Sequence, residues 1–427
     1  MDKKEIFALA VKNHQKNNLQ VAKNLYIKTL EIDPNNIDAY NNLGLVFGKL
    51  EEFNKAIDCY EKAIHINSKS AVIYNNLGLV YEKCKKLDKA IDCYQKSTQV
   101  NPRYALAYFN LGNVLKILGK FNDAKNAYEK TIHIQPNHAP AHNNFGDLLS
   151  DMAENEKAKK AYEKAIQIEP NFITAYWNLH SFSSDIDEAL NILKKLCKIN
   201  NNFIKAKIMI SALNGFKGNF DDFNALIDTK DSKHPYTRSI KWVFSLPKLP
   251  KIFFNRWKFY DAIIALTDKS RVFYEFGVWN GASFQYLINT FKNGFGFDTF
   301  TGLPENWHHE NVGAYSSFGL VPKIKGGKFI VGKFEDTLPK FFATKRPLAS
   351  LINFDADLYS STLCALNYSN KVIDEKSILI FDEFLMSENW ENDEYKALSE
   401  FCNNSNLSYE VLAISLFSRQ VAIKLKK

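Results

Sequence analysis

A 34-residue internal period runs through the first 170 residues of this 427-residue chain. Alanine recurs at one position of the period and tyrosine four residues later, at Ala22, Ala56, Ala90, Ala124 and Ala158 and at Tyr26, Tyr60, Tyr94, Tyr128 and Tyr162. Glycine marks another position, at Gly44, Gly78, Gly112 and Gly146. Small residues at a fixed spacing let two helices cross closely, and large residues fill the adjacent space. The period therefore predicts a stack of helical hairpins.

The pattern resembles the tetratricopeptide repeat in its period and in the residue type at most signature positions. Proline, which ends a helix, closes four repeats, and Ser68 takes its place once, after Pro34 and before Pro102, Pro136 and Pro170. Beyond Pro170 the register decays, and His180 replaces the glycine. We expect an array of about six repeats over residues 1–202, the last one degenerate, and then a degenerate cap and linker over residues 203–250.

Asparagine also recurs every 34 residues on the first helix of each predicted hairpin, at Asn42, Asn76, Asn110, Asn144 and Asn178. In this architecture the first helices line the concave face, where carboxamides can pair with the backbone of an extended peptide. The column resembles the asparagine ladder of the O-linked N-acetylglucosamine transferases, which implies a protein or peptide partner on that face. The alternative is that asparagine is only the usual polar residue at this position.

Composition narrows the remaining functions. A net charge of +8, with basic residues interleaved with acidic ones, indicates solvated helix faces, and we expect no nucleic-acid partner. No apolar run approaches the roughly 20 residues of a membrane span, so we expect no membrane span and a cytoplasmic protein. The six cysteines show no C-x-x-C spacing, which favours structural roles.

From residue 251 to residue 427 apolar strands alternate with helices. We expect strands at residues 271–276, 294–297, 328–331, 349–354 and 377–381, helices at 253–266, 281–291, 336–342, 360–372 and 393–401, and a closing strand pair at 409–414 and 420–425. Such alternation indicates an α/β Rossmann-like domain, with a mostly parallel sheet and an antiparallel edge strand. Its ligands are expected beyond the carboxyl ends of the strands.

The first of these strands is followed by a turn that is suited to a nucleoside. Gly277 permits the turn, Gly281 lets the next helix begin close to a ligand, and Asp298 follows at the spacing of an acid that binds a ribose diol. A dinucleotide fingerprint has glycine where Trp279 stands, so a ligand without a pyrophosphate fits better, and S-adenosylmethionine is such a ligand. The predicted cofactor-binding residues are Glu275, Gly277, Gly281, Asp298, Glu335 and Asp336.

Four acids follow the two strands that end at residues 354 and 381, namely Asp355, Asp357, Asp382 and Glu383. Like charges gathered in a cleft destabilise the ionised state unless a cation balances them. Oxygen ligands select a hard cation, so Mg²⁺ is expected. Capping of helix N-termini is the alternative explanation for one or two of the acids.

Residues 271–403 resemble the macrocin O-methyltransferase type of class I methyltransferase. The matching strings are Tyr274-Glu275-Phe276-Gly277-Val278, Phe297-Asp298-Thr299-Phe300-Thr301-Gly302-Leu303-Pro304, Phe334-Glu335-Asp336-Thr337-Leu338-Pro339, Asp355-Ala356-Asp357-Leu358-Tyr359 and Phe381-Asp382-Glu383. The resemblance implies that Asp355, Asp382 and Glu383 bind the metal and that Asp357 is the general base. Glu383 departs from the aspartate found in relatives.

These features lead us to expect a methyltransferase that uses S-adenosylmethionine and Mg²⁺ to methylate a hydroxyl of a sugar, a glycan or a related small molecule, with the repeats binding a partner. Two alternatives stay open: a protein methyltransferase that holds its substrate in the repeat groove, and a scaffold with an inactive domain. The loop at residues 305–325 contains Trp307, His308, His309, Tyr315 and Phe318, which suits a lid or an acceptor wall. Adjacent histidines in such a loop serve either catalysis or solvation.

Overall fold

The computed structural model describes residues 2–317 and 319–426 and divides into two compact units. The first, here called the repeat unit, comprises Met1–Ser150 and Glu156–Pro170. The second, here called the sheet unit, comprises Asp151–Asn155 and Asn171–Lys427. No helix within the described ranges is long and apolar enough to cross a membrane.

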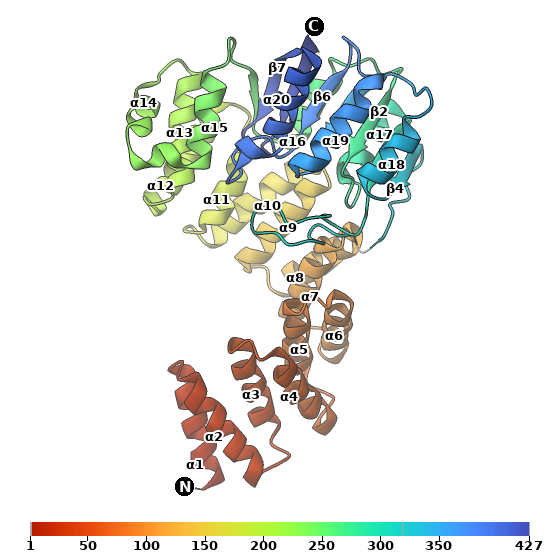
Figure 1. Ribbon diagram of the computed structural model, residues 1–427. Coiled ribbons are helices and arrows are strands. Elements are labelled where there is room, and N and C mark those ends of the chain that lie inside the picture. The colour runs from red at the N-terminus through yellow and green to blue at the C-terminus, as the bar shows by residue number, and fades with distance from the viewer. Residues whose placement is uncertain (1, 318, 427) are drawn as a thin grey trace. The chain divides into compact units, whose positions relative to one another are not determined.

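The repeat unit is built from antiparallel helix pairs (Figure 1). Its helices are α1 (Lys3–Gln15), α2 (Leu19–Ile32), α3 (Ile37–Lys49), α4 (Phe53–Ile66), α5 (Ala71–Lys83), α6 (Leu87–Val100), α7 (Ala105–Ile117), α8 (Phe121–Ile134), α9 (Ala139–Asp151) and α10 (Asn155–Ile168). This arrangement confirms the helical hairpins that the period predicts.

The glycine of each hairpin is explained by the tyrosine on its second helix. A Cβ atom placed on Gly44 in α3 would lie 2.7 Å from Cζ of Tyr60 in α4. Gly78 stands in the same relation to Tyr94, at 2.6 Å from Cε1. Both tyrosines are buried. The two helices of a hairpin can pack this closely only because the ring takes the volume that a side chain would occupy.

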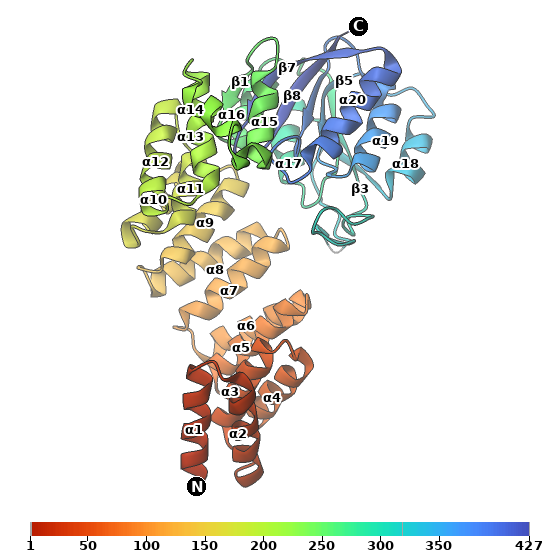
Figure 2. The same cartoon turned by 60° about the vertical axis from the view of Figure 1, so that its left-hand side comes forward.

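The sheet unit begins with helices that the sequence analysis assigns to the last repeat, the cap and the linker. They are α11 (Ile173–His180), α12 (Ile186–Ile199), α13 (Ile204–Phe216), α14 (Asp221–Ile227), η1 (Lys230–Lys233) and α15 (Pro235–Phe244), and they lie beside the β1–β7 side of the sheet (Figure 2). The prediction of a linker within residues 203–250 is therefore wrong, because helices occupy most of this segment. Pro235, which the sequence analysis counts among the linker residues, starts α15, where its missing N–H costs nothing.

Eight strands form one sheet in the order β1-β7-β8-β6-β5-β2-β3-β4. They are β1 (Lys251–Phe253), β2 (Val272–Phe276), β3 (Gly294–Asp298), β4 (Gly327–Val331), β5 (Ala349–Phe354), β6 (Ile378–Phe381), β7 (Ser408–Ser415) and β8 (Val421–Lys426). If β2 to β6 are numbered one to five, their spatial order is 3-2-1-4-5, and all four pairings among them are parallel. Such a sheet has a topological switch point between its first and fourth strands, here β2 and β5.

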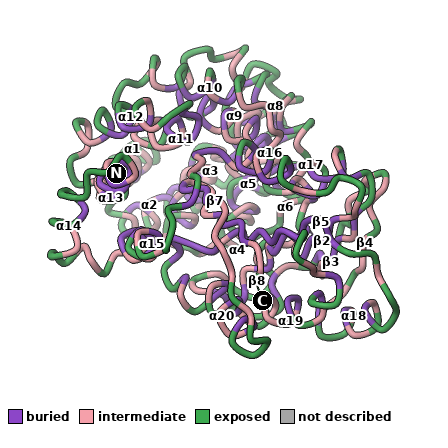
Figure 3. Tube along the Cα trace, turned by 90° about the horizontal axis from the view of Figure 1, so that it is seen from above, coloured by how far each residue is buried: buried purple, intermediate pink, exposed green. Residues whose placement is uncertain are grey.

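Helices cover both faces of the sheet. On one face α18 (Phe334–Phe341), α19 (Tyr359–Ser369) and α20 (Glu394–Ser405) share a core with Tyr274, Phe276 and Phe354. On the other face α16 (Arg256–Ile264) and α17 (Ala282–Phe291) pack on Phe273 and Leu351. Short helices η2 (Asn370–Val372) and η3 (Trp390–Asn392) complete the unit. The central strands β2 and β5 consist almost entirely of buried residues, which are purple in Figure 3.

Two details of the sheet differ from the prediction. The antiparallel strand β8 is not an edge strand, because it is inserted between β6 and β7. The edge is formed by β1, which pairs in parallel with β7 and occupies the start of the segment predicted as helix 253–266. That helix begins only at Arg256, where Asn255 caps it by accepting hydrogen bonds from two backbone N–H groups.

Candidate active site

A cavity of ≈ 700 Å³ opens at the carboxyl ends of the parallel strands. Its wall includes Gly277 after β2, Asp298 at the end of β3, Asp355 and Asp357 after β5, and Asp382 after β6. It therefore lies at the switch point between β2 and β5, where sheets of this topology bind ligands. Its volume suits a ligand of nucleoside size with a second small molecule.

Gly277 is required where the two central strands meet. Its φ is +88°, and a Cβ atom there would lie 1.8 Å from the carbonyl oxygen of Asp355. Asp355 N donates to the carbonyl oxygen of Phe276 at 2.8 Å, which holds the two strand ends together. No other residue type has room at this position, so the prediction that Gly277 belongs to the site is supported by its position.

Asp298 is fixed by backbone N–H groups. Oδ2 accepts hydrogen bonds from the N–H groups of Val278 and Trp279, both at 2.7 Å, and Oδ1 accepts one from Phe300 at 2.6 Å. A carboxylate offers about four acceptor positions, so one remains for a ligand in the cavity. These hydrogen bonds hold the β2–α17 turn against Asp298, which lines the cavity.

Glu275 does not line the cavity. Side chains alternate along β2, and Glu275 points to the face covered by α16 and α17. Its Oε1 accepts hydrogen bonds from Ser283 Oγ at 2.5 Å and from Asn353 Nδ2 at 2.9 Å, while Oε2 has no hydrogen-bond partner in the described part of the chain. Burial raises the pKa of this carboxyl to about 8, and the two donors oppose the rise. The geometry gives Glu275 a place beneath the site and no direct contact with a cofactor.

The other predicted cofactor residues are divided between the cavity and the surface. Glu335, at the start of α18, lines the cavity, whereas Asp336 is exposed outside it. Gly281, with φ +81°, caps α17, and the space beside it is taken by Pro322 and Ile324. Gly281 therefore permits loop packing at the N-terminus of α17 instead of close approach by a ligand in the cavity.

Asp355 and Asp357 face the cavity in a strongly acidic environment. The pKa of Asp355 is raised well above its ordinary value, first by burial and then by the charge of Asp382. The pKa of Asp357 is raised by burial and then by Glu383. The structure therefore brings the four predicted acids together, as their positions after neighbouring strands predict.

Two arginines balance the other pair of acids, and the sequence analysis missed both. Arg256 Nη2 lies 3.0 Å and 3.2 Å from the two carboxylate oxygens of Asp382, and Gln420 Nε2 donates to the same carboxylate. Arg419 Nη1 donates to Glu383 Oε2 at 2.6 Å. Guanidinium groups thus provide the positive charge that the sequence analysis assigns to Mg²⁺.

The predicted metal ligands Asp355, Asp382 and Glu383 have the oxygen chemistry that Mg²⁺ requires, but their arrangement does not fit it. Among the described residues, no three His, Cys, Asp or Glu side chains are grouped so that they could hold a metal ion. Arg256 and Arg419 would have to turn away before the ion could bind. No metal ion is therefore assigned a role in the proposed methyl transfer.

A fifth acid, Glu394, is buried beside this cluster. Its pKa is raised well above its ordinary value, by burial first and then by Asp357, Asp382 and Glu383. In the sequence, Asp393-Glu394 reads as an acidic pair at a helix start, and α20 indeed begins there. Nothing local distinguishes a capping acid from one that reaches the site.

The helices before the sheet form part of the cavity wall. His234 and Tyr236, at the start of α15, line the cavity together with Lys205 of α13. Arg238 Nε and Nη2 donate to the carboxylate of Glu391 at 2.6 Å and 3.1 Å, which joins α15 to η3. These contacts place a helical segment that precedes the sheet in chain order opposite the acids.

The loop predicted as a lid also contributes. Trp307, His308 and Tyr315 line the cavity, and Phe318 lies outside the described residues. His308 Nε2 lies 2.8 Å from Asp393 Oδ2, so this histidine has a carboxylate partner. His309 also lines the cavity, but its side chain is 85% exposed and its Nε2 lies 3.5 Å from Glu310 Oε1.

Unusual backbone conformations concentrate around the cavity. Six non-glycine residues of its wall have φ between 48° and 65°, namely Trp279, His308, Tyr315, Asp357, Met386 and Arg419. Each such conformation costs roughly 1–3 kcal/mol and persists only where the surrounding structure enforces it. Their concentration here marks the cavity as the functional site of the sheet unit.

In the repeat unit, the asparagine column links neighbouring repeats. Asn76 Nδ2 donates to Asn41 Oδ1 at 3.0 Å, and Asn110 Nδ2 donates to Asn75 Oδ1 at 2.9 Å. Asn144 Nδ2 donates instead to Asn113 Oδ1 of the preceding repeat, and Asn42 accepts a hydrogen bond from Asn41 within its own repeat. Each amide keeps donor or acceptor capacity beyond these bonds. Asn178 belongs to α11 of the sheet unit.

Comparison with known protein families identifies the repeats. Residues 37–70, 71–104 and 105–138 match the tetratricopeptide repeat, residues 13–51 match a TPR repeat model, and residues 139–172 match a further tetratricopeptide repeat model. The first part of the chain is therefore a tetratricopeptide array, an architecture that binds protein or peptide partners. This confirms the predicted repeats.

Several solved structures are similar to part of the chain. MamA shares 30% identity over 40% of this chain and 92% of its own, with a TM-score of 0.36. PilF of Pseudomonas aeruginosa shares 24% identity over 51% and 96%, with a TM-score of 0.43. YrrB, described as a TPR protein with an unusual peptide-binding site, shares 21% identity over 45% and 97%, with a TM-score of 0.37. No curated protein matches the chain.

Proposed function

We propose that the sheet unit is a class I methyltransferase that binds S-adenosylmethionine and transfers its methyl group to a hydroxyl of a sugar, a glycan or a related metabolite. The observation that carries this proposal is the cavity at the β2–β5 switch point, which joins Asp298 on one side to Asp357 on the other. The strings that resemble the macrocin O-methyltransferases line the same cavity, with Gly277, Asp298, Glu335, Asp355 and Asp382.

The wall of the cavity favours a nucleoside without a pyrophosphate. Trp279, whose φ is 48°, places an indole where dinucleotide-binding turns carry glycine. Its ring lies 6.4 Å from that of Tyr315. The backbone N–H groups of Val278 and Trp279 already donate to Asp298, so they are not available to phosphates, while Asp298 keeps an acceptor position for a ribose hydroxyl.

The residues of the chain position the reactants and manage the proton. When bound, S-adenosylmethionine supplies a methyl group that its sulfonium already activates, so positioning is the main catalytic task. Asp298 holds the ribose, and Asp357 accepts a hydrogen bond from the acceptor hydroxyl. The resemblance also assigns Asp357 as the base. Arg256 and Arg419 hold the carboxyl groups of Asp382 and Glu383 in place beside it.

In this proposal the tetratricopeptide array binds a protein partner, while the sheet unit transfers the methyl group. In a second version of the proposal, the polypeptide in the array groove is itself the methyl acceptor. The inter-repeat bond of Asn76, which is half-buried, leaves one amide hydrogen on its side chain for a bound backbone. The acceptor distinguishes the two versions.

Calorimetry with S-adenosylmethionine on the full chain tests the cofactor. We expect the Asp298→Ala variant to bind at least about tenfold more weakly, because a ribose hydrogen bond to a charged group contributes about 1.5–3 kcal/mol. Asp336→Ala is the matched control, since Asp336 follows the next strand but lies outside the cavity. Its affinity should equal that of the wild type.

A turnover screen then identifies the acceptor. The tritium-labelled methyl group is offered to mixed mono- and oligosaccharides and, separately, to proteins captured by the array. Label in the sugar fraction supports the first version, and label in a protein band supports the second. If wild-type protein releases no heat with S-adenosylmethionine, the proposed function is wrong and the chain is a repeat scaffold.

A further inference from the structure

His308, in the cavity wall, is paired with Asp393, which lies behind it. Nε2 of His308 lies 2.8 Å from Oδ2 of Asp393, and each side chain is 10% exposed. His308 comes from the loop after β3, and Asp393 directly precedes α20. Residues 85 positions apart in sequence are thus held in contact at the same cavity that contains Asp298 and Asp357.

The pair has a defined direction. An ionised Asp393 can only accept, so the tautomer that fits this contact has its proton on Nε2 and leaves Nδ1 as the acceptor of the ring. No described residue hydrogen-bonds to Nδ1. Asp393 is itself fixed, because its carbonyl oxygen accepts the N–H of Ala397 at the start of α20.

The loop holds His308 in a conformation that it would not adopt freely. Its φ is 50°, and the flanking residues Trp307 and Glu310 exchange two backbone hydrogen bonds at 3.0 Å and 2.7 Å. The indole of Trp307 packs on the imidazole, with ring centroids 4.9 Å apart. A strained histidine with a buried carboxylate partner, in a cavity wall, is the arrangement of a catalytic base.

We propose that His308 is the catalytic base of the methyl transfer and that Asp393 is its positioning residue. This inference rests on the proposed function. The acceptor oxygen forms a bond to the methyl carbon, the carbon–sulfur bond breaks with its electron pair going to sulfur, and the hydroxyl proton passes to Nδ1 of His308 and then to water. The products are the methyl ether and S-adenosylhomocysteine.

The arginine pairs explain why a histidine base is needed. A metal-bound hydroxyl is acidic enough for a carboxylate to deprotonate, but Asp382 and Glu383 are paired with Arg256 and Arg419. A hydroxyl that no metal acidifies needs a positioned base during methyl transfer, and histidine is the commonest such base. Burial and Glu383 raise the pKa of Asp357, so this carboxyl holds its proton more readily and is suited to orient the hydroxyl by a hydrogen bond.

The first test measures the tautomer of His308 by heteronuclear NMR of the histidine-labelled full chain, with the His308→Gln spectrum assigning its signals. We expect a proton on Nε2 and none on Nδ1 in the wild type, and a mixture of tautomers in Asp393→Asn. A proton on Nδ1 in the wild type would overturn the proposal, because that atom could not accept another.

The second test measures methyl transfer from S-adenosylmethionine to mixed mono- and oligosaccharides. His308→Gln should lower kcat by about 10²–10⁴-fold while the cofactor Kd stays within twofold. Asp393→Asn should lower kcat and leave the acceptor KM unchanged, and added imidazole should restore part of the activity of His308→Gly. His133→Gln is the control and should retain its activity, since His133 is an exposed residue of α8 in the repeat unit and does not line the cavity.

The outcomes distinguish an error in the assignment of His308 from an error in the proposed function. Cofactor binding with an unchanged kcat in His308→Gln would overturn the assignment of His308 and leave the proposed function intact. A wild-type chain that neither binds S-adenosylmethionine nor transfers its methyl group would overturn both.

Discussion

Replacing Arg256 tests whether a guanidinium occupies the place of a metal ion. Arg256 contacts both carboxylate oxygens of Asp382, a residue that is only 6% exposed. In Arg256→Met the aliphatic part of the side chain is kept and the charge is lost. The acids Asp355, Asp357, Asp382 and Glu383 then share one remaining arginine, Arg419. We expect two effects, a loss of stability and a new affinity for Mg²⁺.

The size of the first effect follows from burial. Removing one partner of a buried ion pair costs about 3–5 kcal/mol. Arg256 retains 35% of its side-chain exposure, and Gln420 still donates to Asp382, so we expect about 2–3 kcal/mol. For a unit of this size that lowers Tm by roughly 4–12 °C. Mg²⁺ at about 100 times its Kd should return about 2.7 kcal/mol.

Tryptophan fluorescence during heating isolates this effect from the repeats. All six tryptophans, Trp177, Trp242, Trp257, Trp279, Trp307 and Trp390, belong to the sheet unit. The wild type and Arg256→Met are heated with MgCl₂ and with EDTA. Only the variant should gain Tm from Mg²⁺. A wild-type Tm that rises with Mg²⁺ as much as that of the variant would show that the metal binds despite the arginines.

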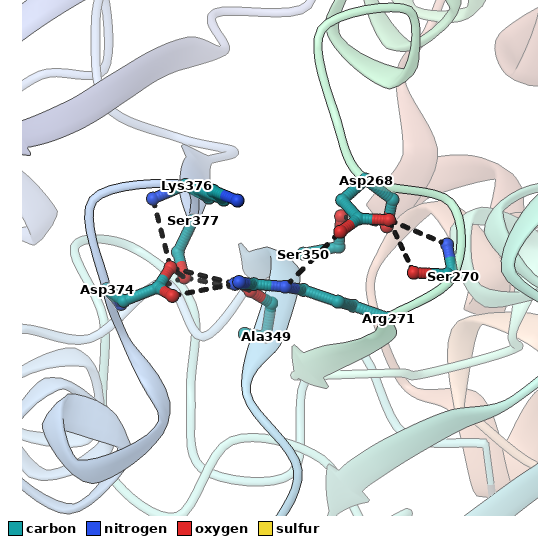
Figure 4. Close-up of polar contacts among 8 residues, drawn as sticks. All are labelled: Asp268, Ser270, Arg271, Ala349, Ser350, Asp374, Lys376 and Ser377. Carbon is teal, nitrogen blue, oxygen red and sulfur yellow. Dashed lines mark hydrogen bonds and ion pairs between the residues drawn. The ribbon is translucent and has the colours of Figure 1, made fainter.

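Arg271→Met is the matched control. Arg271 Nη1 lies 2.8 Å and 2.9 Å from the carboxylate oxygens of Asp374, and Asp268 lies nearby (Figure 4). The pair stands at the opposite end of the strands, where β2, β5 and β6 begin. The control should lose stability but gain no response to Mg²⁺, because only two acids remain there. A Mg²⁺ response in the control would mean that any unpaired acid suffices.

Three further predictions use the same stability measurements. Glu275 keeps its proton up to a pKa of about 8 in the folded state and only to 4.5 when unfolded, so stability should fall by roughly 4 kcal/mol across that range. Glu275→Gln should abolish this fall, as urea titrations of tryptophan fluorescence at several pH values will show, without weakening S-adenosylmethionine binding. The pKa of Asp374 is lowered from 3.8 to about 2, mainly by Arg271, so its contribution of about 2 kcal/mol is present above 3.8 and lost as pH falls through 2. Asp374→Asn should lose that contribution at neutral pH in the same titration, and equal stability would contradict the pairing. Gly44→Ala places Cβ 2.7 Å from the Tyr60 ring, whereas Gly48→Ala on the same helix meets nothing within 4 Å. Urea unfolding followed by circular dichroism should show loss of about 1–2 kcal/mol for the first and gain of up to about 1 kcal/mol for the second, and equal effects would contradict the packing.

The sequence predicts those parts of the fold in which a local residue pattern also determines which residues pack against each other. The 34-residue period predicts both the helix pairs and the contact between Gly44 and Tyr60, because the glycine and the tyrosine recur together in four successive hairpins. Each apolar run in the second half becomes a strand within one or two residues of its predicted bounds. The residues after those runs then lie at one edge of the sheet, so the acids Asp355 and Asp382 could be placed together in advance.

The orientation of Glu275 could not be predicted in the same way. It stands in a strand buried on both faces, where apolar residues give no alternation to distinguish one face from the other. Counting back from Gly277 places Glu275 near the turn but does not give its side. The buried donors Ser283 and Asn353 come from α17 and β5, and only the assembled sheet brings them to it.

Residues 203–250 show a second limit of local pattern. Their charged run and the prolines at Pro235, Pro247 and Pro250 are typical of a linker. In the folded chain Pro235 starts a helix, and Met386 N donates to Ser239 Oγ at 2.8 Å. The stabilising partner is 147 residues away, so composition within the segment contains no sign of it.

The same limit decides the chemistry proposed for the site. Four acids after two strands predict a cation, and that inference is sound, but its identity depends on which cations the fold delivers. Arg256 comes from the start of α16, between β1 and β2, and Arg419 comes from the turn between the last two strands. Arg256 and Asp382 are 126 residues apart, so the pair is visible only in three dimensions. Once guanidinium groups hold Asp382 and Glu383, the hydroxyl has no metal to acidify it. The base must then come from elsewhere in the wall, and of the groups that line it, His308 has both a carboxylate partner and an unoccupied ring nitrogen.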